Sequence, residues 1–343
     1  MPRRAVTDFR APRDRLSRPL ADLRISVTDR CNFRCRYCMP KEVFGSDFAF
    51  LPRSEILSFE EICRLARVFH RLGVRKFRLT GGEPLLRAEL PVLIEMLAAL
   101  PDSEVALTTN GALLGQQAGA LAAAGLNRVT VSLDAVDDVV FHRINDVRFP
   151  VEDVLQGIDA AVEVGLVPIK VNAVIKKGVN DDHLVELAEH FKGSPAILRF
   201  IEFMDVGNTN GWRMDDVVSG AEMVERIQAV HPLESIEPNH PGEVAKRWRY
   251  KDGEGEIGII TSVTRPFCGD CTRARLSADG RLFTCLFAAK GIDVRALLRS
   301  GSGDDALTEL VSAIWSRRRD RDSELRALAT PNQRRVEMSY IGG

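Results

Sequence analysis

Residues 128–134 read RVTVSLD, and apolar and polar residues alternate strictly along this stretch. In a β-strand, successive side chains point to opposite faces, so one face here is apolar and the other is polar. The apolar face holds Val129, Val131 and Leu133, and the polar face holds Thr130, Ser132 and Asp134. A strand covered by helices on both faces is apolar on both. RVTVSLD therefore predicts a strand with helices on one side and a ligand-holding interior on the other.

The same alternation occurs in LRISVTD (23–29) and KFRLTGG (76–82), where Arg24 and Arg78 lie on the polar face. Six such β-like segments alternate with helical patterns. The strands are expected at 23–29, 76–82, 105–111, 128–134, 168–175 and 196–203, and the helices at 58–72, 89–99, 113–125, 151–165, 181–192 and 219–230. This order predicts parallel β-α units with right-handed crossovers, in a doubly wound sheet or a barrel. The one-sided polarity favours an incomplete (β/α)6 TIM-like barrel with its active end at the strand carboxyl ends.

Three regions are expected along the chain. Residues 1–15 form a polar lead-in, residues 16–230 the partial barrel, and residues 231–343 a C-terminal region. The C-terminal region begins with the proline-rich stretch HPLESIEPNHPGE, which is expected to be a linker. A charged helix is predicted over residues 304–328, with RRRDR (317–321) on its solvated face.

The composition is typical of a soluble globular protein, with 45% hydrophobic and 28% charged residues among 343. The apolar runs are too short for a membrane span, and the N-terminus has no apolar core of a signal peptide. We therefore expect a cytoplasmic protein that does not enter a membrane. The net charge of −1 argues against nucleic acid as a partner.

The first cysteine set, Cys31, Cys35 and Cys38, follows the first predicted strand with the spacing C-x3-C-x2-C. A zinc knuckle or a stripe of buried thiols would be the structural interpretation, but a closed zinc site needs a fourth ligand and no histidine lies nearby. Three thiolates suffice for a 4Fe–4S cluster that leaves one iron open to another ligand. A seventh cysteine, Cys63, stands alone in a helical pattern and is expected to be a buried apolar residue.

The second set, Cys268, Cys271 and Cys285, again offers three ligands without an adjacent histidine. A zinc ribbon with one distant ligand is the alternative to a second 4Fe–4S cluster with an open iron. Two open clusters in one chain would allow one to activate a cofactor while the other binds the substrate.

CNFRCRYC (31–38) together with TGGEP (80–84) resembles the radical S-adenosylmethionine superfamily. Longer stretches resemble one of its families, the GTP 3′,8-cyclases of molybdenum cofactor (molybdopterin) biosynthesis, from about residue 16 to residue 343. They include LRISVTDRCNFRCRYCMP, FRLTGGEPLLR, RFIEFMDVGNTNGW, PFCGDCTRARLSADGRLFTCLF and MSYIGG.

The resemblance implies a lyase with two 4Fe–4S clusters and S-adenosylmethionine as cofactors and GTP as substrate. A 5′-deoxyadenosyl radical would remove the hydrogen at C3′ of GTP, and the ribose radical would attack guanine C8. The implied product is (8S)-3′,8-cyclo-7,8-dihydroguanosine 5′-triphosphate. Implied partners are a low-potential electron donor and a downstream cyclic pyranopterin monophosphate synthase, and a homodimer is one expected assembly.

The resemblance also assigns roles to residues. Those implied to contact GTP are Arg24, Arg78, Thr108, Lys170, Arg273 and Arg275. Those implied to contact S-adenosylmethionine are Tyr37, Gly82, Ser132 and Met204. Catalytic roles are implied for Gly342 and Gly343, and Arg199 is a further candidate. Independently of the resemblance, so many cations on the polar faces of strands would require a multiply charged anion unless acidic residues pair with them.

Two alternatives remain at this point. A peptide-modifying radical enzyme with an auxiliary cluster would share the first motif, but such enzymes usually have more C-terminal cysteines and no terminal Gly-Gly. A zinc-stabilised binding module would use the cysteines for structure alone.

Overall fold

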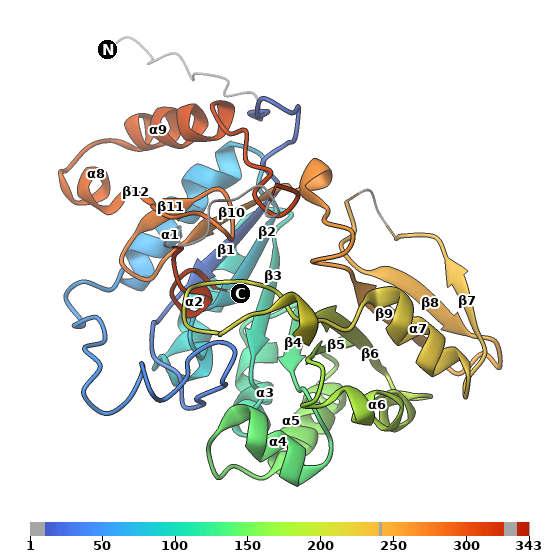
Figure 1. Cartoon of the computed structure of the whole chain (residues 1–343). Coiled ribbons are helices and arrows are strands. Elements are labelled where there is room, and N and C mark those ends of the chain that lie inside the picture. The colour runs from blue at the N-terminus through green and yellow to red at the C-terminus, as the bar shows by residue number, and fades with distance from the viewer. Residues whose placement is uncertain (1–10, 240–241, 326–334, 343) are drawn as a thin grey trace.

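The computed structural model describes residues 11–239, 242–325 and 335–342 (Figure 1). Six parallel strands form its centre in the order of the sequence. They are β1 (Asp22–Ser26), β2 (Lys76–Thr80), β3 (Glu104–Thr109), β4 (Arg128–Ser132), β5 (Ile169–Ile175) and β6 (Ala196–Glu202). A doubly wound sheet would reverse its strand order at a switch point, and these six strands do not. The prediction of an incomplete TIM-like barrel is confirmed.

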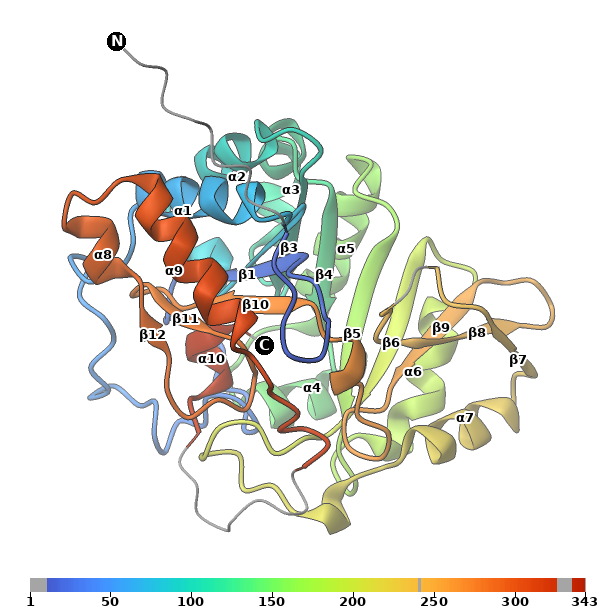
Figure 2. The same cartoon turned by 90° about the horizontal axis from the view of Figure 1, so that it is seen from above.

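Helices connect these strands and cover one face of the sheet (Figures 1 and 2). The α-helices are α1 (Phe59–Arg71), α2 (Leu90–Ala98), α3 (Leu114–Ala123), α4 (Asp138–Asn145), α5 (Val151–Glu163), α6 (Leu184–Phe191), α7 (Gly220–Gln228), α8 (Arg295–Arg299), α9 (Asp304–Ser316) and α10 (Met338–Ile341). Short 3-10 helices lie at Pro84–Leu86, Asp181–His183, Met214–Asp216 and Cys268–Asp270. All six predicted barrel helices are present, and α4 is an additional helix that the sequence analysis missed.

The C-terminal region extends the sheet at both edges. On one edge β9 (Glu256–Ile260) pairs in parallel with β6, and β8 (Lys246–Tyr250) and β7 (Leu233–Ile236) follow in antiparallel order. On the other edge β10 (Arg273–Leu276) pairs in parallel with β1, followed by β11 (Arg281–Phe283) and β12 (Ile292–Asp293). The proline-rich stretch expected to be a linker therefore contains a strand. The boundary between the barrel and the C-terminal region at residue 231 stays a prediction.

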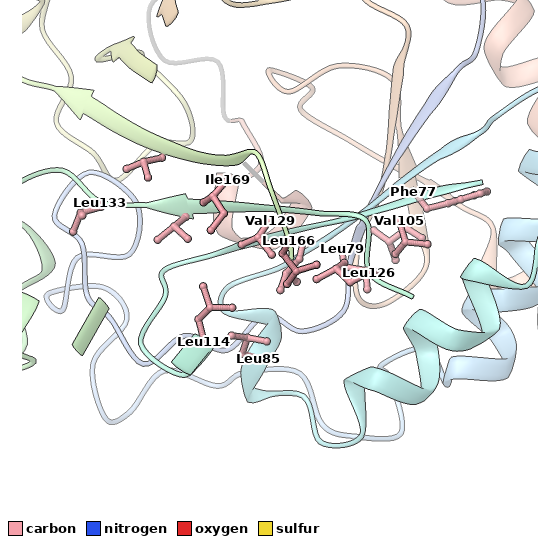
Figure 3. Packing of buried hydrophobic residues seen from close by; sticks show 14 of the residues in the cluster. Phe77, Leu79, Leu85, Val105, Leu114, Leu126, Val129, Leu133, Leu166 and Ile169 are labelled. Atoms are coloured by element: carbon pink, nitrogen blue, oxygen red, sulfur yellow. The ribbon is translucent and has the colours of Figure 1, made fainter. Parts of the chain in front are cut away.

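The hydrophobic core lies between the strands and their helices (Figure 3). The strand positions predicted to face the helices are fully buried, including Leu79, Val129 and Val131. Leu85 and Leu114 pack beneath them, and Cys63 on α1 is buried as expected. Burial of each such side chain contributes about 1.5–3 kcal/mol to the free energy of folding. A shift of one residue would expose the apolar face of a strand, so burial fixes the register.

The predicted helix over residues 304–328 is wrong for residues 317–325, because α9 ends at Ser316, and residues 326–328 lie outside the described residues. The prediction that RRRDR is solvated is wrong for Arg318, which is only 4% exposed, whereas Arg317 and Arg319 are exposed. The Arg318 side chain turns inward to reach Asp14 and the backbone of Cys271. Helical periodicity cannot reveal such a distant partner.

The N-terminal lead-in is packed over the part of it that the structure describes. Arg13 forms a β-bridge with Pro19, and Asp14 is 7% exposed. Among the described residues, no helix is both long and apolar enough to span a membrane.

Candidate active site

The first cysteine loop follows β1 and is fastened to α4, the helix that was not predicted. The backbone N–H groups of Arg34 and Arg36 donate to the carbonyls of Asn145 and Ile144, at 2.9 and 3.1 Å. These carbonyls lie at the carboxyl end of α4, where they have no partner within the helix. The ring of Phe33 also packs edge-on against Phe141 of α4, with centroids 5.9 Å apart. Helix α4 therefore positions the cysteine loop.

The three thiols of this loop have the donor chemistry of an iron–sulfur cluster. Burial raises the pKa of Cys31 to about 11 and raises the pKa values of Cys35 and Cys38, each of which the neighbouring thiols raise further. Thiolates at such a place need a metal cation as partner. No three His, Cys, Asp or Glu side chains in the described residues are arranged to hold one metal ion. Each thiolate of a 4Fe–4S cluster binds a different iron, so the set fits a cluster.

The glycine-rich loop after β2 lies directly against the cysteine loop. Gly82 N donates to Thr28 O at 2.9 Å, and Glu83 N donates to Arg30 O at 2.8 Å. A Cβ atom on Gly82 would overlap the carbonyl oxygen of Arg30. The close approach that requires glycine here is therefore an approach to the cysteine loop, which fixes the two loops relative to each other.

Glu83 connects these loops to the end of β3, a role that the sequence analysis missed. Its carboxylate accepts hydrogen bonds from Thr109 Oγ1 (2.7 Å), Leu85 N (3.0 Å) and Asn110 N (2.7 Å). Burial raises the pKa of Glu83 to about 7, although the three donors oppose this shift. A glutamate directly after two glycines at a strand end was the available signal.

Replacing Glu83 by glutamine is expected to lower the free energy of unfolding by about 2 kcal/mol. Every partner of Glu83 donates a hydrogen bond. Glutamine would put its NH2 group, a donor, where the carboxylate has an acceptor oxygen, so one donor would be left opposite another. Urea denaturation of the anaerobic protein measures the effect, and Glu95→Gln on the exposed face of α2 is the matched control. Equal unfolding free energies for the two variants would show that the carboxylate is not needed.

The four residues assigned to S-adenosylmethionine lie at the same end of the barrel. Gly82 follows β2, Ser132 ends β4, and Met204 lies two residues after β6, while Tyr37 belongs to the cysteine loop. Tyr37 Oη donates to Asp134 Oδ2 at 2.7 Å, and Asp134 Oδ1 accepts from Val174 N at 2.8 Å. Burial raises the pKa of Asp134 to about 6, while its two donors favour the charged form.

The cations predicted on the polar faces form a cluster inside the barrel. Arg24 of β1 is the direct neighbour of Arg78 on β2 and of Arg275 on β10. Lys170 and Arg199 come from β5 and β6. Arg78 Nη1 donates to Thr108 Oγ1 and Thr130 Oγ1, each at 3.2 Å.

Among the described residues, Asp22 and Glu104 attract this cluster electrostatically but form no ion pair with it. No ion pair is formed by Arg24, Arg78, Lys170, Arg199, Arg273 or Arg275. The buried Nε of Arg24 has no hydrogen-bond partner at all. Burial and mutual repulsion lower the pKa values of Arg24, of Lys170 to about 8 and of Arg275 to about 10. Buried cations without ion pairs are stabilised when an anion binds next to them.

The second cysteine set lies at the opposite end of the same strands. Cys271 precedes β10 and Cys285 follows the antiparallel β11, so both lie where β1 begins, whereas Cys31 follows the end of β1. Burial would raise the pKa of Cys271, but the guanidinium groups of Arg273 and Arg318 lower it to about 6. Cys271 therefore favours the thiolate, whereas burial raises the pKa values of Cys268 and Cys285. As in the first set, a metal cation would stabilise these thiolates, so the set fits a second cluster. Arg24 and Arg275 lie on the strands between the two sets.

The C-terminal tail enters this interior beside β1, which α10 contacts (Figure 2). The carbonyl oxygen of Gly342 accepts a hydrogen bond from Arg275. A Cβ atom on Gly342 would lie closer to Thr80 Cγ2 than real Cβ atoms do, and the backbone φ of 74° also favours glycine. Gly343 lies outside the described residues.

Comparison with known proteins agrees with this site. Residues 25–191 match the model of the radical SAM superfamily, and residues 196–324 match Molybdenum Cofactor Synthesis C. A GTP 3′,8-cyclase of Acidothermus cellulolyticus is 57% identical, with 96% of this chain and 99% of that protein covered. A GTP 3′,8-cyclase of Staphylococcus saprophyticus is 50% identical, with 96% and 98% covered.

Among solved structures, the fold resembles that of Streptococcus suis SuiB bound to S-adenosylmethionine. The TM-score is 0.62 at 14% identity, over 87% of this chain and 69% of that one. At this identity the similarity concerns the fold alone. Since the sequence relatives cover almost the whole chain at 50% identity or more, the chain belongs to the GTP 3′,8-cyclase family of the radical SAM superfamily.

Proposed function

We propose that the chain binds GTP inside the barrel, between two 4Fe–4S clusters, and joins C3′ of its ribose to C8 of its guanine. This would be the first step of molybdenum cofactor biosynthesis, in agreement with the family. The observation that carries the proposal is the unpaired cation cluster between the two cysteine sets.

A nucleoside triphosphate suits this cluster in charge and in size. Arg24, Arg78 and Arg275 occupy adjacent positions on three strands, so that one extended anion can contact them together. Each charge-assisted hydrogen bond to a phosphate oxygen contributes about 1.5–3 kcal/mol. Lys170, Arg273 and the hydroxyl of Thr108 complete the proposed GTP contacts.

The cysteines have a separate role at each end. Cys31, Cys35 and Cys38 would hold the first cluster, and Cys268, Cys271 and Cys285 the second. When bound, the first cluster and S-adenosylmethionine supply the radical that removes a hydrogen atom from the substrate. Tyr37, held by Asp134, would help to orient S-adenosylmethionine at the strand carboxyl ends together with Gly82, Ser132 and Met204.

The proposed catalytic set consists of Gly342, Gly343 and Arg199. Gly342 lies beside Arg275 in the interior, where a side chain would overlap Thr80. Arg199 Nε donates to Asn172 Oδ1 at 2.9 Å, which directs its guanidinium from the polar face of β6. Burial and Arg78 lower the pKa of Arg199 to about 9, so this cation also favours an anionic ligand.

The remaining proposals concern partners and organisation. A low-potential electron donor would reduce the first cluster, and a cyclic pyranopterin monophosphate synthase would consume the product. We propose a cytoplasmic location, a homodimer, and regions with boundaries near residues 16 and 231. The two strand additions by β9 and β10 support one continuous working unit in place of an independent C-terminal module.

Replacing Arg24 by methionine is expected to weaken GTP binding by roughly tenfold to a hundredfold without lowering the stability of the ligand-free protein. Arg24 has no ion pair to lose, and the repulsion by three neighbouring arginines, which neutralisation relieves, exceeds the attraction of Asp22. Equilibrium binding and thermal unfolding measure the two effects. Arg249→Met, at an exposed ion pair with Glu234, is the control. Loss of stability with unchanged GTP affinity would assign Arg24 to the fold alone.

The function itself is tested by anaerobic incubation with S-adenosylmethionine, a strong reductant and GTP carrying deuterium at C3′. We expect about eight irons per chain, and 5′-deoxyadenosine that forms only with GTP and carries the deuterium. 5′-Deoxyadenosine that forms equally without GTP would contradict the proposed substrate. Zinc without sulfide would contradict the clusters.

A further inference from the structure

Two buried arginines from distant parts of the chain meet behind the second cysteine set. Arg18 precedes β1 and Arg318 follows α9, and both guanidinium groups contact the carboxylate of Asp14. Arg18 Nε lies 2.6 Å from Asp14 Oδ2, and Arg318 Nη1 lies 3.6 Å from the same oxygen. The three side chains are at most 2% exposed. We refer to Asp14, Arg18 and Arg318 as the arginine clamp.

Both arginines of the clamp donate hydrogen bonds to the backbone of the proposed cysteine ligands. Arg18 Nη1 donates to the carbonyl of Cys268 at 2.6 Å, and Arg318 Nη1 donates to the carbonyl of Cys271 at 2.6 Å. Arg318 Nη2 also lies 3.2 Å from Cys271 Sγ, as a donor to the sulfur. One guanidinium thus fixes the backbone of this ligand and contacts its sulfur.

The packing around the clamp keeps it rigid. Trp315 Nε1 donates to Arg18 O at 3.1 Å, and the Arg318 guanidinium stacks on the Trp315 ring at 4.5 Å from its centroid. Arg15 N donates to Arg318 O at 3.0 Å. The N-terminal segment and the end of α9 are therefore joined at this one place.

The three clamp residues together carry one more positive charge than negative charge. Two buried cations share the fully buried carboxylate of Asp14, and Arg18 Nη2 has no hydrogen-bond partner. Asp320, whose side chain is 27% exposed, lies 3.4 Å from Arg318 Nε. Asp322 interacts with both Arg318 and Cys285. Asp320 and Asp322 are more exposed than the clamp, so they offset its buried charge only in part, and a further negative group beside the clamp is stabilised. A cluster bound by three thiolates carries such a negative charge.

We propose that the arginine clamp positions Cys268 and Cys271 for the second iron–sulfur cluster and that Arg318 raises the reduction potential of this cluster through its charge and its N–H···S contact. The inference rests on the proposed second cluster and adds to it the residues that orient and tune it. Hydrogen bonds to ligand sulfur and nearby positive charge favour the reduced cluster, and outer residues of this kind affect metal sites strongly.

Arg318→Met tests the proposal with the full chain. Methionine retains most of the length of the side chain and removes the charge and the donors, while Asp14 keeps its 2.6 Å partner Arg18. Arg319→Met, at the exposed neighbouring position, is the matched control, and Arg318→Lys restores the charge alone. The midpoint potential is measured by an anaerobic redox titration followed by electron paramagnetic resonance. A Cys31→Ala, Cys35→Ala background leaves the second cluster as the source of the signal.

We expect Arg318→Met to lower the equilibrium constant for one-electron reduction about tenfold, which corresponds to 59 mV. Arg318→Lys should show a smaller shift in the same direction, and Arg319→Met none. If Arg318→Met loses the second cluster and keeps the first, the positioning role is supported. The midpoint potential of the second cluster is then measured in Arg318→Lys. Full iron content with wild-type potentials in both Arg318 variants would overturn the inference. A wild-type chain that binds about four irons would instead overturn the second cluster itself.

Discussion

Cys35→Ala is expected to abolish formation of 5′-deoxyadenosine and to lower bound iron from about eight to about four atoms per chain. Cys35 is the middle residue of its set, and its thiol is one of three proposed ligands that leave no spare donor. Its carbonyl accepts from Cys38 N and Met39 N, at 2.9 and 2.8 Å. Alanine keeps these backbone bonds, so the loop should fold without the thiol.

Cys63→Ala is the matched control, because it removes the same side chain from a fully buried place on α1. The Cys63 sulfur contacts Met96 O at 3.8 Å, far along the chain from either cysteine set. This variant should keep all of its iron and its activity, with a loss of stability of about 1 kcal/mol from the small cavity. If Cys35→Ala retained eight irons and its activity, the assignment of the first cluster ligands would be wrong.

The barrel could be predicted from the sequence because burial acts on alternate residues. On β4, Val129 and Val131 must be removed from water. On β1 and β2, Arg24 and Arg78 must face away from the helices. Each strand has one orientation that meets its requirement. The same reasoning placed the cations on a common surface before any contact was known. Strand positions are therefore well predicted wherever the two faces differ in polarity.

The missed features depend on partners far away in the sequence. Helix α4 lies within the connection between β4 and β5, where a single helix was expected, and its carboxyl end is needed by the cysteine loop. Arg318 has two exposed arginine neighbours, and only its contacts with Asp14 and Cys271 distinguish it from them. Glu83 likewise accepts from Thr109 on β3. The local pattern around each of these residues does not identify its distant partner.

The tail provides the second large effect, since Gly342→Ala is expected to reduce kcat/KM about a hundredfold, as misplacement by about 1 Å can do. The new methyl group would overlap Cγ2 of Thr80, which lies at the end of β2 in the core of the sheet. The methyl group should displace the tail, so that its carbonyl leaves Arg275.

A double variant separates overlap from backbone strain. Thr80→Ser removes the atom that the methyl group would strike and keeps the hydroxyl, so Gly342→Ala with Thr80→Ser should recover part of the lost activity. The remaining deficit reflects the φ of 74°, which costs an alanine roughly 1 kcal/mol. Gly301→Ala is the control for that strain, with φ of 81° and no atom within 4 Å of the new methyl group. The kcat/KM values of the wild type, Gly342→Ala, the double variant and Gly301→Ala separate the effect of overlap from that of strain. Full activity in Gly342→Ala would show that the interior does not need a residue without a side chain at this position.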